Sequence, residues 1–234
     1  MKYHVILFDV SDTLVRYEPN YAQIYGDRLK KIGIDTSIND RTKISKVVNQ
    51  TIYHEVQKEQ NGAKHLTEKE LNEKVDYAVL SQVISKGEKF NRVFENFHKL
   101  AIPKQELIVM DGVYEVLNFL KGRYQLGIIS NHKTWLMDYL HKCKLDSYFD
   151  SIIISDIVGI SKPDSAIMHL ALKELEIEAN QCLYVGDQPL DILCSKGAGL
   201  DCVWLTSENK LPESIPYKAD YIIRDIRELI ELLS

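Results

Sequence analysis

The feature that most constrains the fold is an alternation, from Gly112 onward, between short apolar runs and helical patterns. Val113, Val116, Leu117 and Leu120, for example, form an amphipathic stripe at helical spacing. Apolar runs too short for helices occupy residues 126–129, 152–154, 183–185, 203–205 and 221–223, and the opening run at 5–8 has the same character. Continuously apolar strands separated by helices predict an α/β fold, with a parallel sheet covered on both faces.

The segment between Tyr17 and about Leu100 has a helical pattern throughout. Within it, Thr67-Glu-Lys-Glu70 is a capping-box sequence that predicts the start of a helix. We therefore expect a Rossmann-like core made of residues 1–15 and 103–234, with an α-helical cap at 16–102 inserted after the first strand. Such an insertion would leave both linkers beside the carboxyl edge of the sheet, where a lid could close over a ligand.

Charge and cysteine usage limit the classes of partner and location. The chain has 29 Lys and Arg against 34 Asp and Glu, a net charge of −5, which disfavours non-specific binding to nucleic acid or anionic membranes. The sequence contains neither an apolar run approaching the roughly 18 residues of a membrane helix nor a signal-peptide pattern. Its four cysteines lack CxxC or metal-finger spacing, and this usage fits a reducing cytoplasm.

Polar residues follow several of the predicted strands directly. Asp9 follows the first run, Ser130 and Asn131 follow residues 126–129, and Gly186-Asp187 follows residues 183–185, with Asp191 four positions further on. The loop beyond residues 152–154 carries Lys162. In an open parallel sheet, ligands bind beyond the carboxyl ends of the strands. If these strands are neighbours, one edge of the sheet gathers carboxylates, a hydroxyl and an ammonium.

This combination of groups suits phosphoryl transfer. The carboxylates of Asp9 and Asp187 are hard oxygen ligands of the kind that Mg²⁺ prefers, and the Asp9 carboxylate could attack phosphorus. Ser130 and the backbone N–H groups that follow it could hold phosphoryl oxygens, and Lys162 would offset the negative charge. Each signal alone is weak, but their joint order along the chain is much more specific.

Four motifs in this order resemble those of haloacid dehalogenase (HAD)-superfamily hydrolases of the branch with a helical (C1-type) cap. They are FDVSDTL at 8–14, IISN at 128–131, SKPD at 161–164 and VGDQPLD at 185–191. The resemblance covers most of the core, at residues 1–15 and about 103–234, whereas the cap resembles the family only in its position and helical character.

The resemblance implies catalytic and metal-binding roles for four residues. Asp9 is the nucleophile and a ligand of Mg²⁺, and Asp187 is a second ligand. Asp191 supports the metal or the lysine from nearby, and the backbone carbonyl of Ser11 completes the predicted metal site.

The resemblance also implies a phosphate-binding set. Thr13 and Ser130 position the phosphoryl group, and Asn131 is placed beside them. Lys162 bridges the nucleophile and the phosphate.

Ser11 is a departure from the family pattern, because phosphatases of this kind usually have an aspartate there as general acid/base. A serine hydroxyl titrates far above neutrality and serves that purpose poorly. Asp12 is adjacent, but neighbouring residues on an extended segment point to opposite sides, which argues against Asp12 as a substitute. The serine therefore predicts weak activity or a substrate with a good leaving group.

The sequence thus predicts an Mg²⁺-dependent hydrolase of a small phosphorylated metabolite that works through an aspartyl-phosphate. Two alternatives stay open: a 2-haloacid dehalogenase, which attacks carbon, and a non-catalytic member that binds a phosphorylated ligand. The dehalogenase alternative predicts loss of the metal-binding acid, whereas Asp187 and Asp191 are both present. Neither the substrate nor the oligomeric state follows from the sequence.

Overall fold

The computed structural model describes residues 2–60, 62–206 and 215–234, which form two compact units. One unit contains residues 1–16 and 107–234, and the other contains residues 17–106. The predicted insertion at 16–102 differs from the second unit by one residue at its start and four at its end. Among the described residues, no helix combines the length and the apolar character needed to cross a membrane.

The first unit is built on a six-stranded parallel sheet with the order β5-β4-β1-β6-β7-β8. The strands are β1 (Val5–Phe8), β4 (Gln125–Ser130), β5 (Ser151–Ile154), β6 (Cys182–Gly186), β7 (Asp201–Leu205) and β8 (Tyr221–Ile223). The central strand β1 is buried on both faces, as its continuous apolar sequence predicts. The predicted α/β fold class is confirmed.

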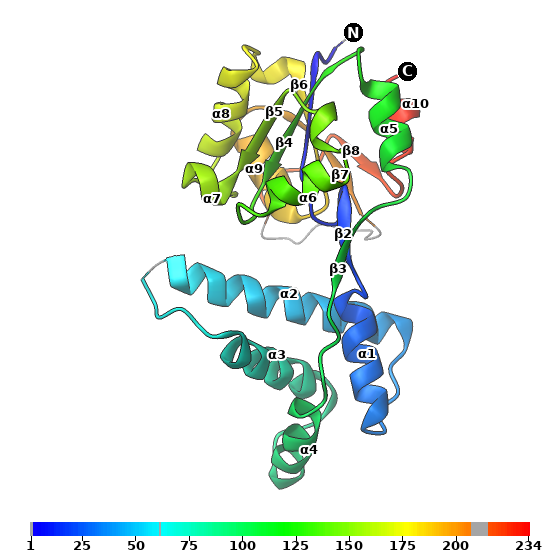
Figure 1. The fold of residues 1–234 in the computed structure, drawn as a ribbon, viewed down its shortest axis with the longest axis vertical. Coiled ribbons are helices and arrows are strands. Elements are labelled where there is room, and N and C mark those ends of the chain that lie inside the picture. Colours follow the sequence, from blue (N-terminus) through cyan, green and yellow to red (C-terminus); the bar gives the residue numbers. More distant parts are fainter. Residues whose placement is uncertain (1, 61, 207–214) are drawn as a thin grey trace. The chain divides into compact units, whose positions relative to one another are not determined.

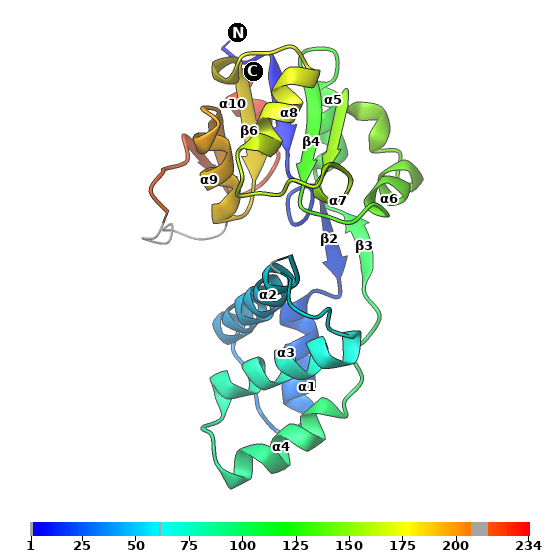
Figure 2. The same cartoon turned by 90° about the vertical axis from the view of Figure 1, so that its left-hand side faces the viewer.

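Helices cover both faces of this sheet (Figures 1 and 2). They are α5 (Val113–Leu120), α6 (Leu136–Lys142), α7 (Ser155–Val158), α8 (Ala166–Glu174), α9 (Pro189–Gly197) and α10 (Glu228–Leu232), with short 3-10 turns η1 (Asp146–Tyr148) and η2 (Ala179–Gln181). Side chains alternate along β1: Ile6 and Phe8 pack in one core cluster with α5, α6 and α10, and Val5 and Leu7 pack in the other with α8 and α9.

The second unit is a helical domain with its own apolar core. It contains α1 (Tyr21–Lys31), α2 (Ile38–Gln60), α3 (Glu68–Val83) and α4 (Glu88–His98) (Figure 2). The predicted capping box at Thr67 and Glu70 is confirmed as the start of α3. The chain passes between the units through β2 (Val15–Glu18) and β3 (Glu106–Val109), which pair as a two-stranded sheet.

The strand order fixes where the polar residues of the first unit lie. In the parallel register, Phe8 of β1 is opposite Ile128 of β4 on one side and Val185 of β6 on the other. Residues just beyond these positions therefore leave the same edge of the sheet, because all three strands run in the same direction.

Candidate active site

Three carboxylates gather at the carboxyl edge of the sheet. Asp9 follows β1, Asp187 follows β6, and Asp191 lies in the first turn of α9. Each offers one oxygen, and the three oxygens lie within 4.8 Å of one another. Asp9 and Asp191 are buried, with 6% and 0% of their surface exposed. Buried carboxylates this close repel one another unless positive charge lies between them.

Lys162 provides positive charge inside this cluster. Its ammonium Nζ donates to Asp9 Oδ1 at 2.5 Å, to Asp191 Oδ1 at 2.7 Å and to the Tyr184 hydroxyl at 3.0 Å. The side chain is almost fully buried. A lysine is buried in this way only when its ammonium is paired, and two carboxylates and a hydroxyl provide that pairing here.

Asp191 is fixed through both of its oxygens. Oδ1 accepts from Lys162, and Oδ2 accepts at 2.9 Å from the backbone N–H of Gln188, the residue that caps α9. Gly186 leaves room for this side chain, since a Cβ at that position would lie only 2.5 Å from the Asp191 carboxylate. Asp191 is therefore a partner of Lys162 and part of the start of a helix at once.

Burial and neighbouring charges shift the pKa values of Asp9, Asp187 and Lys162. Burial raises the pKa of Asp9 to about 6, although the Lys162 ammonium pulls the pKa back down. Burial, together with the nearby Asp9 and Asp191 charges, raises the pKa of Asp187 well above its usual range. Burial opposes the charge of Lys162, but the Asp191 and Asp9 carboxylates outweigh it and raise the lysine pKa.

The donor set fits a divalent cation. With all groups ionised, three carboxylates face one ammonium, so the cluster holds more negative than positive charge. After burial, the negative charges of Asp9 and Asp191 are the next causes that raise the pKa of Asp187, in keeping with this excess. A hard dication bound by Asp9 and Asp187 would relieve this excess, and Mg²⁺ suits a site with few protein oxygens.

The predicted site includes three residues with hydroxyl groups, Thr13, Ser130 and Ser11, which differ in burial and in position. The buried Thr13 hydroxyl donates to Asp187 Oδ1 over 3.4 Å, so it lies beside the carboxylates. Ser130 is the last residue of β4 and is buried at the same edge of the sheet. Ser11 is half-buried in the turn after β1, where it forms an isolated β-bridge with Val15.

Asn131, which the sequence places in the phosphate-binding set, contacts the backbone of Lys162. Its side-chain Oδ1 accepts from the backbone N–H of Lys162 at 2.8 Å, and its Nδ2 donates to the backbone carbonyl of Lys162, also at 2.8 Å. Both ends of the amide are therefore bonded to the main chain of the lysine. In this structure, the side chain of Asn131 holds the Lys162 loop against the end of β4.

The expectation that Ser11 and Asp12 lie on an extended segment is wrong. Asp12 has a left-handed backbone with φ of 58°, and its N–H donates to the Val15 carbonyl at 2.6 Å, so the chain turns here. Burial raises the pKa of Asp12, and its charge acts on Asp187. Aspartate is among the few non-glycine residues that adopt this conformation readily, which accounts for the turn.

Sequence reasoning missed Tyr184. The residue lies in β6, is fully buried, and places its hydroxyl against the Lys162 ammonium. The available signal was weak: a hydroxyl-bearing residue two positions before Gly186, in a strand that is otherwise apolar. Trp204 was missed as well, and its indole N–H donates to the Asp187 backbone carbonyl at 2.8 Å.

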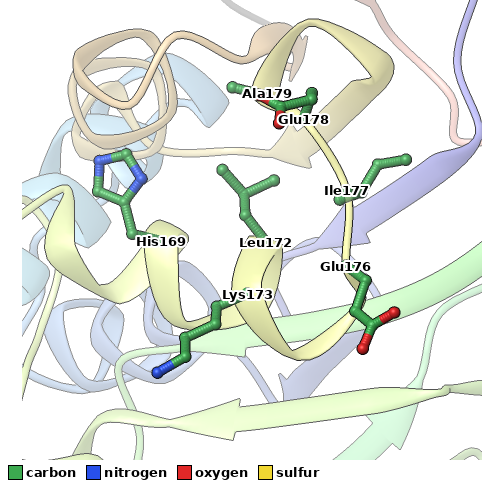
Figure 3. A pocket seen from close by; sticks show the side chains of 7 residues that line it. All are labelled: His169, Leu172, Lys173, Glu176, Ile177, Glu178 and Ala179. Atoms are coloured by element: carbon green, nitrogen blue, oxygen red, sulfur yellow. The ribbon is translucent and has the colours of Figure 1, made fainter.

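A hollow of about 400 Å³ lies elsewhere on this unit (Figure 3). It is bordered by the end of α8 and by the segment that leads into the start of β6, and its lining residues are His169, Leu172, Lys173, Glu176, Ile177, Glu178 and Ala179. The candidate site lies beyond the carboxyl ends of the strands, whereas this segment precedes the amino end of β6. None of the predicted site residues lines this hollow.

Comparison with protein families gives a match over most of the chain. The model of the haloacid dehalogenase-like hydrolase family matches residues 6–205. A phosphoglycolate phosphatase of Colwellia psychrerythraea is 32% identical over 205 residues, which cover 86% of this chain and 84% of that protein.

Solved structures show the same fold at low sequence identity. A Bacillus subtilis protein described as a HAD-hydrolase bound to magnesium aligns over the full length of both chains, with a TM-score of 0.64 and 20% identity. An L-2-haloacid dehalogenase aligns over all of this chain and 99% of its own, with a TM-score of 0.66 and 17% identity. At these identities, both structures show a likeness of fold alone.

Proposed function

The chain belongs to the haloacid dehalogenase-like hydrolases, and from this premise we propose that it hydrolyses a small phosphorylated metabolite through a phosphorylated Asp9. It is an enzyme of the phosphatase type, as its sequence relatives indicate. The observation that carries the proposal is the ion pair between Asp9 Oδ1 and Lys162 Nζ, 2.5 Å long, within a cluster that also contains Asp187.

Asp9 is the proposed nucleophile. Lys162 holds its Oδ1, so we assign the attack on phosphorus to Oδ2. The Oδ2–phosphorus bond forms as the bond from phosphorus to the leaving oxygen breaks, and that oxygen then takes up a proton. A water molecule next attacks phosphorus, which restores the Asp9 carboxylate and releases inorganic phosphate.

The surrounding residues hold the reacting groups. In the proposal, Thr13 and Ser130 donate hydrogen bonds to phosphoryl oxygens from the edge of the sheet, and the Lys162 charge stabilises the developing negative charge. Asp191 and Asn131 keep Lys162 in place from opposite ends, the former at its ammonium and the latter at its backbone.

Mg²⁺ is the proposed cofactor. Asp9, Asp187 and the backbone carbonyl of Ser11 would hold it, with Asp191 nearby, and it would offset the repulsion between an anionic substrate and an anionic nucleophile. The three-carboxylate cluster and its excess negative charge support this assignment.

Ser11 sets the expected strength of the activity. Protonation of the leaving oxygen by a general acid is worth about 10²–10⁴-fold in rate, and a serine supplies little of it. We therefore expect slow turnover of unactivated phosphomonoesters and faster turnover of esters with good leaving groups. The four free cysteines support a cytoplasmic location, where small phosphorylated metabolites would be the substrates.

A screen of phosphorylated metabolites and 2-haloacids, with Mg²⁺ present, tests the proposal. Wild type should release phosphate from at least one phosphomonoester, and Asp9→Asn should lower that rate to background. Asp138→Asn, which changes an exposed carboxylate on α6, is the matched control and should keep the wild-type rate. A rate in Asp9→Asn equal to wild type would refute the nucleophile assignment.

The same screen separates the two alternatives. A dehalogenase would release halide from a 2-haloacid and remain active with a chelator present, whereas the proposed enzyme stops when Mg²⁺ is removed. A non-catalytic member would bind a phosphomonoester with Mg²⁺ without releasing phosphate. Ser11 is the residue that motivates this second alternative.

A further inference from the structure

The hydrogen-bond donors of Lys162 are fully committed. A lysine ammonium has three N–H groups, and the structure gives each of them an acceptor: Asp9 Oδ1, Asp191 Oδ1 and the Tyr184 hydroxyl. The side chain is 3% exposed, so almost none of it is open to solvent. If Lys162 is to donate to a phosphoryl oxygen, it must first give up one of these three bonds.

The bond to Tyr184 is the one most readily given up. It is the longest of the three, at 3.0 Å against 2.5 Å and 2.7 Å, and its acceptor is neutral while the other two are carboxylates. A bond from the ammonium to an anionic oxygen also gains the attraction between opposite charges, which the bond to the neutral hydroxyl lacks. A phosphoryl oxygen, which is itself charged, would therefore replace the hydroxyl with a net gain.

Tyr184 would remain hydrogen-bonded after such an exchange. Its hydroxyl lies 3.2 Å from the Ile129 backbone carbonyl and 3.2 Å from Asp191 Oδ1, and it can donate to either acceptor. Burial keeps the pKa of Tyr184 far above its usual value, so the hydroxyl keeps its proton. The exchange would then leave no buried polar group without a partner. An unpaired buried group is the main cost of breaking a buried hydrogen bond.

The exchange requires little movement of the chain. Asn131 bonds to both the N–H and the carbonyl of Lys162, so the backbone at this residue is held in place. Rotation about the carbon–carbon bonds of the side chain can shift the ammonium, together with its three N–H groups, toward a phosphoryl oxygen without moving the backbone.

We propose that Tyr184 is a positioning residue that holds the third N–H of Lys162 in the free enzyme and yields it to a phosphoryl oxygen when the substrate binds. This inference rests on the proposed function, because it requires that Lys162 contact a phosphoryl group. Neither the sequence motifs nor the relatives assign a role to Tyr184.

Tyr184→Phe tests the exchange, because it removes the hydroxyl and keeps the ring. In the variant, the third N–H lacks its partner until phosphate arrives, so phosphate binding no longer has to break a bond. We expect KM, and the inhibition constant of inorganic phosphate, to fall by about tenfold, the factor that corresponds to one buried hydrogen bond. Because substrate and transition state gain equally, kcat should stay within about twofold of wild type.

Tyr124→Phe is the matched control. The Tyr124 hydroxyl is also buried and donates to the Leu233 backbone carbonyl at 2.9 Å, but it lies just before β4, at the amino end of that strand. This variant should lower the unfolding temperature and leave KM, kcat and phosphate inhibition unchanged. If Tyr184→Phe behaves like the control, or lowers kcat with KM unchanged, the exchange is refuted.

A second measurement, made on the wild type, does not depend on turnover. The Lys162 ammonium of ¹⁵N-lysine-labelled wild type should give a slowly exchanging Nζ signal, assigned by its loss in Lys162→Arg. Inorganic phosphate with Mg²⁺ should shift this signal together with that of the Tyr184 ring. A shift of the lysine signal with an unchanged tyrosine signal would refute the exchange, whatever the outcome of the substrate screen.

Discussion

At the scale of single residues, the candidate site depends on contacts that leave little freedom to each side chain. Lys162 has three acceptors, Asp191 uses both of its oxygens, and Asn131 uses both ends of its amide. A site held in this way keeps its geometry before a ligand arrives, which is the property that electrostatic catalysis requires. Substitutions here should therefore affect rate more than folding.

Replacement of Ser11 tests whether the missing acid limits the rate. Ser11→Asp should raise kcat on unactivated phosphomonoesters by about 10²-fold, because an aspartic acid can protonate the leaving oxygen. Ser11→Asn, which has a similar shape and no proton to give, is the control and should produce no gain. Steady-state rates on an alkyl phosphate measure the effect, and an equal gain in both variants would exclude the acid/base explanation.

Gly186 tests the close approach between backbone and carboxylate. In Gly186→Ala, the new Cβ would lie 2.5 Å from Asp191, so the side chain or the backbone that carries it must shift, and we expect this shift to disturb the contact with Lys162. Displacement of a catalytic group by about 1 Å can cost roughly 10²-fold in rate, and we expect a fall in kcat of that order. Gly87→Ala is the control, because a Cβ at Gly87 meets no atom within 4 Å. Retention of the full rate in Gly186→Ala would show that Asp191 need not stay in place.

At the scale of elements, the second unit encloses an ion pair between two of its helices. Arg28 on α1 donates to both oxygens of Asp76 on α3, at 2.5 Å and 3.0 Å, and both side chains are at most 2% exposed. His98, which ends α4, lies 2.8 Å from the same carboxylate. Removal of one partner would leave an unpaired charge in an apolar core.

Asp76→Ala should therefore destabilise the protein by about 3–5 kcal/mol, as expected when one partner of a buried ion pair is lost. Asp27→Ala is the control, because Asp27 is an exposed neighbour on α1 whose pair with Arg41 is 3.8 Å long, and it should change stability by less than about 0.5 kcal/mol. Urea unfolding measures both. Equal small effects would mean that Arg28 finds other partners, such as the Phe97 and Leu100 carbonyls it already contacts.

The elements that the sequence predicts well are those with a strong periodic pattern. The apolar runs at β1 and β6 predict buried strands and are found as such, because burial on both faces requires a continuous apolar sequence. In contrast, β2 and β3 are partly exposed over most of their length, and their sequences VRYE and ELIV carry no distinct period. Their pairing depends on two segments about 90 residues apart in the sequence, which local patterns do not encode.

The same distinction applies to the site. Asp9 and Asp187 could be placed from the sequence, because each directly follows a predicted strand of one parallel sheet. The partners of Asn131 and Tyr184 could not be placed in this way. Asn131 contacts the Lys162 backbone because of the path of the loop that carries Lys162, and local sequence patterns do not specify that path. Tyr184 lies within an apolar run, where an aromatic residue ordinarily packs in the core.

At the scale of the whole molecule, the proposed Mg²⁺ site would link stability to a bound cation. Without the ion, the like charges of Asp9, Asp187 and Asp191 would destabilise the folded state, and an ion that binds only the folded state would stabilise it. Function and stability therefore impose opposite demands on the same residues.

Mg²⁺ should raise the unfolding temperature of wild type. At about 100 times its dissociation constant, a ligand contributes about 2.7 kcal/mol, or roughly 5–10 °C for a protein of this size. Asp187→Asn should unfold at a higher temperature than wild type without the ion and gain much less from its addition. Asp138→Asn should respond to Mg²⁺ as wild type does. Differential scanning calorimetry with and without a chelator measures all three, and a Mg²⁺ response that survives in Asp187→Asn would remove that residue from the metal site.

The double engagement of Asp191 constrains how this chain can evolve. Its Oδ1 accepts from the lysine and its Oδ2 accepts from the backbone N–H that begins a helix, so loss of the side chain would affect folding as well as the proposed turnover. A descendant that had lost catalysis would still keep this acid, while Asp9 would be free to drift. Among diverged relatives, a chain that keeps the aspartate at position 191 but has replaced the one at position 9 would be one that descended from an enzyme, kept its fold and lost its catalytic activity.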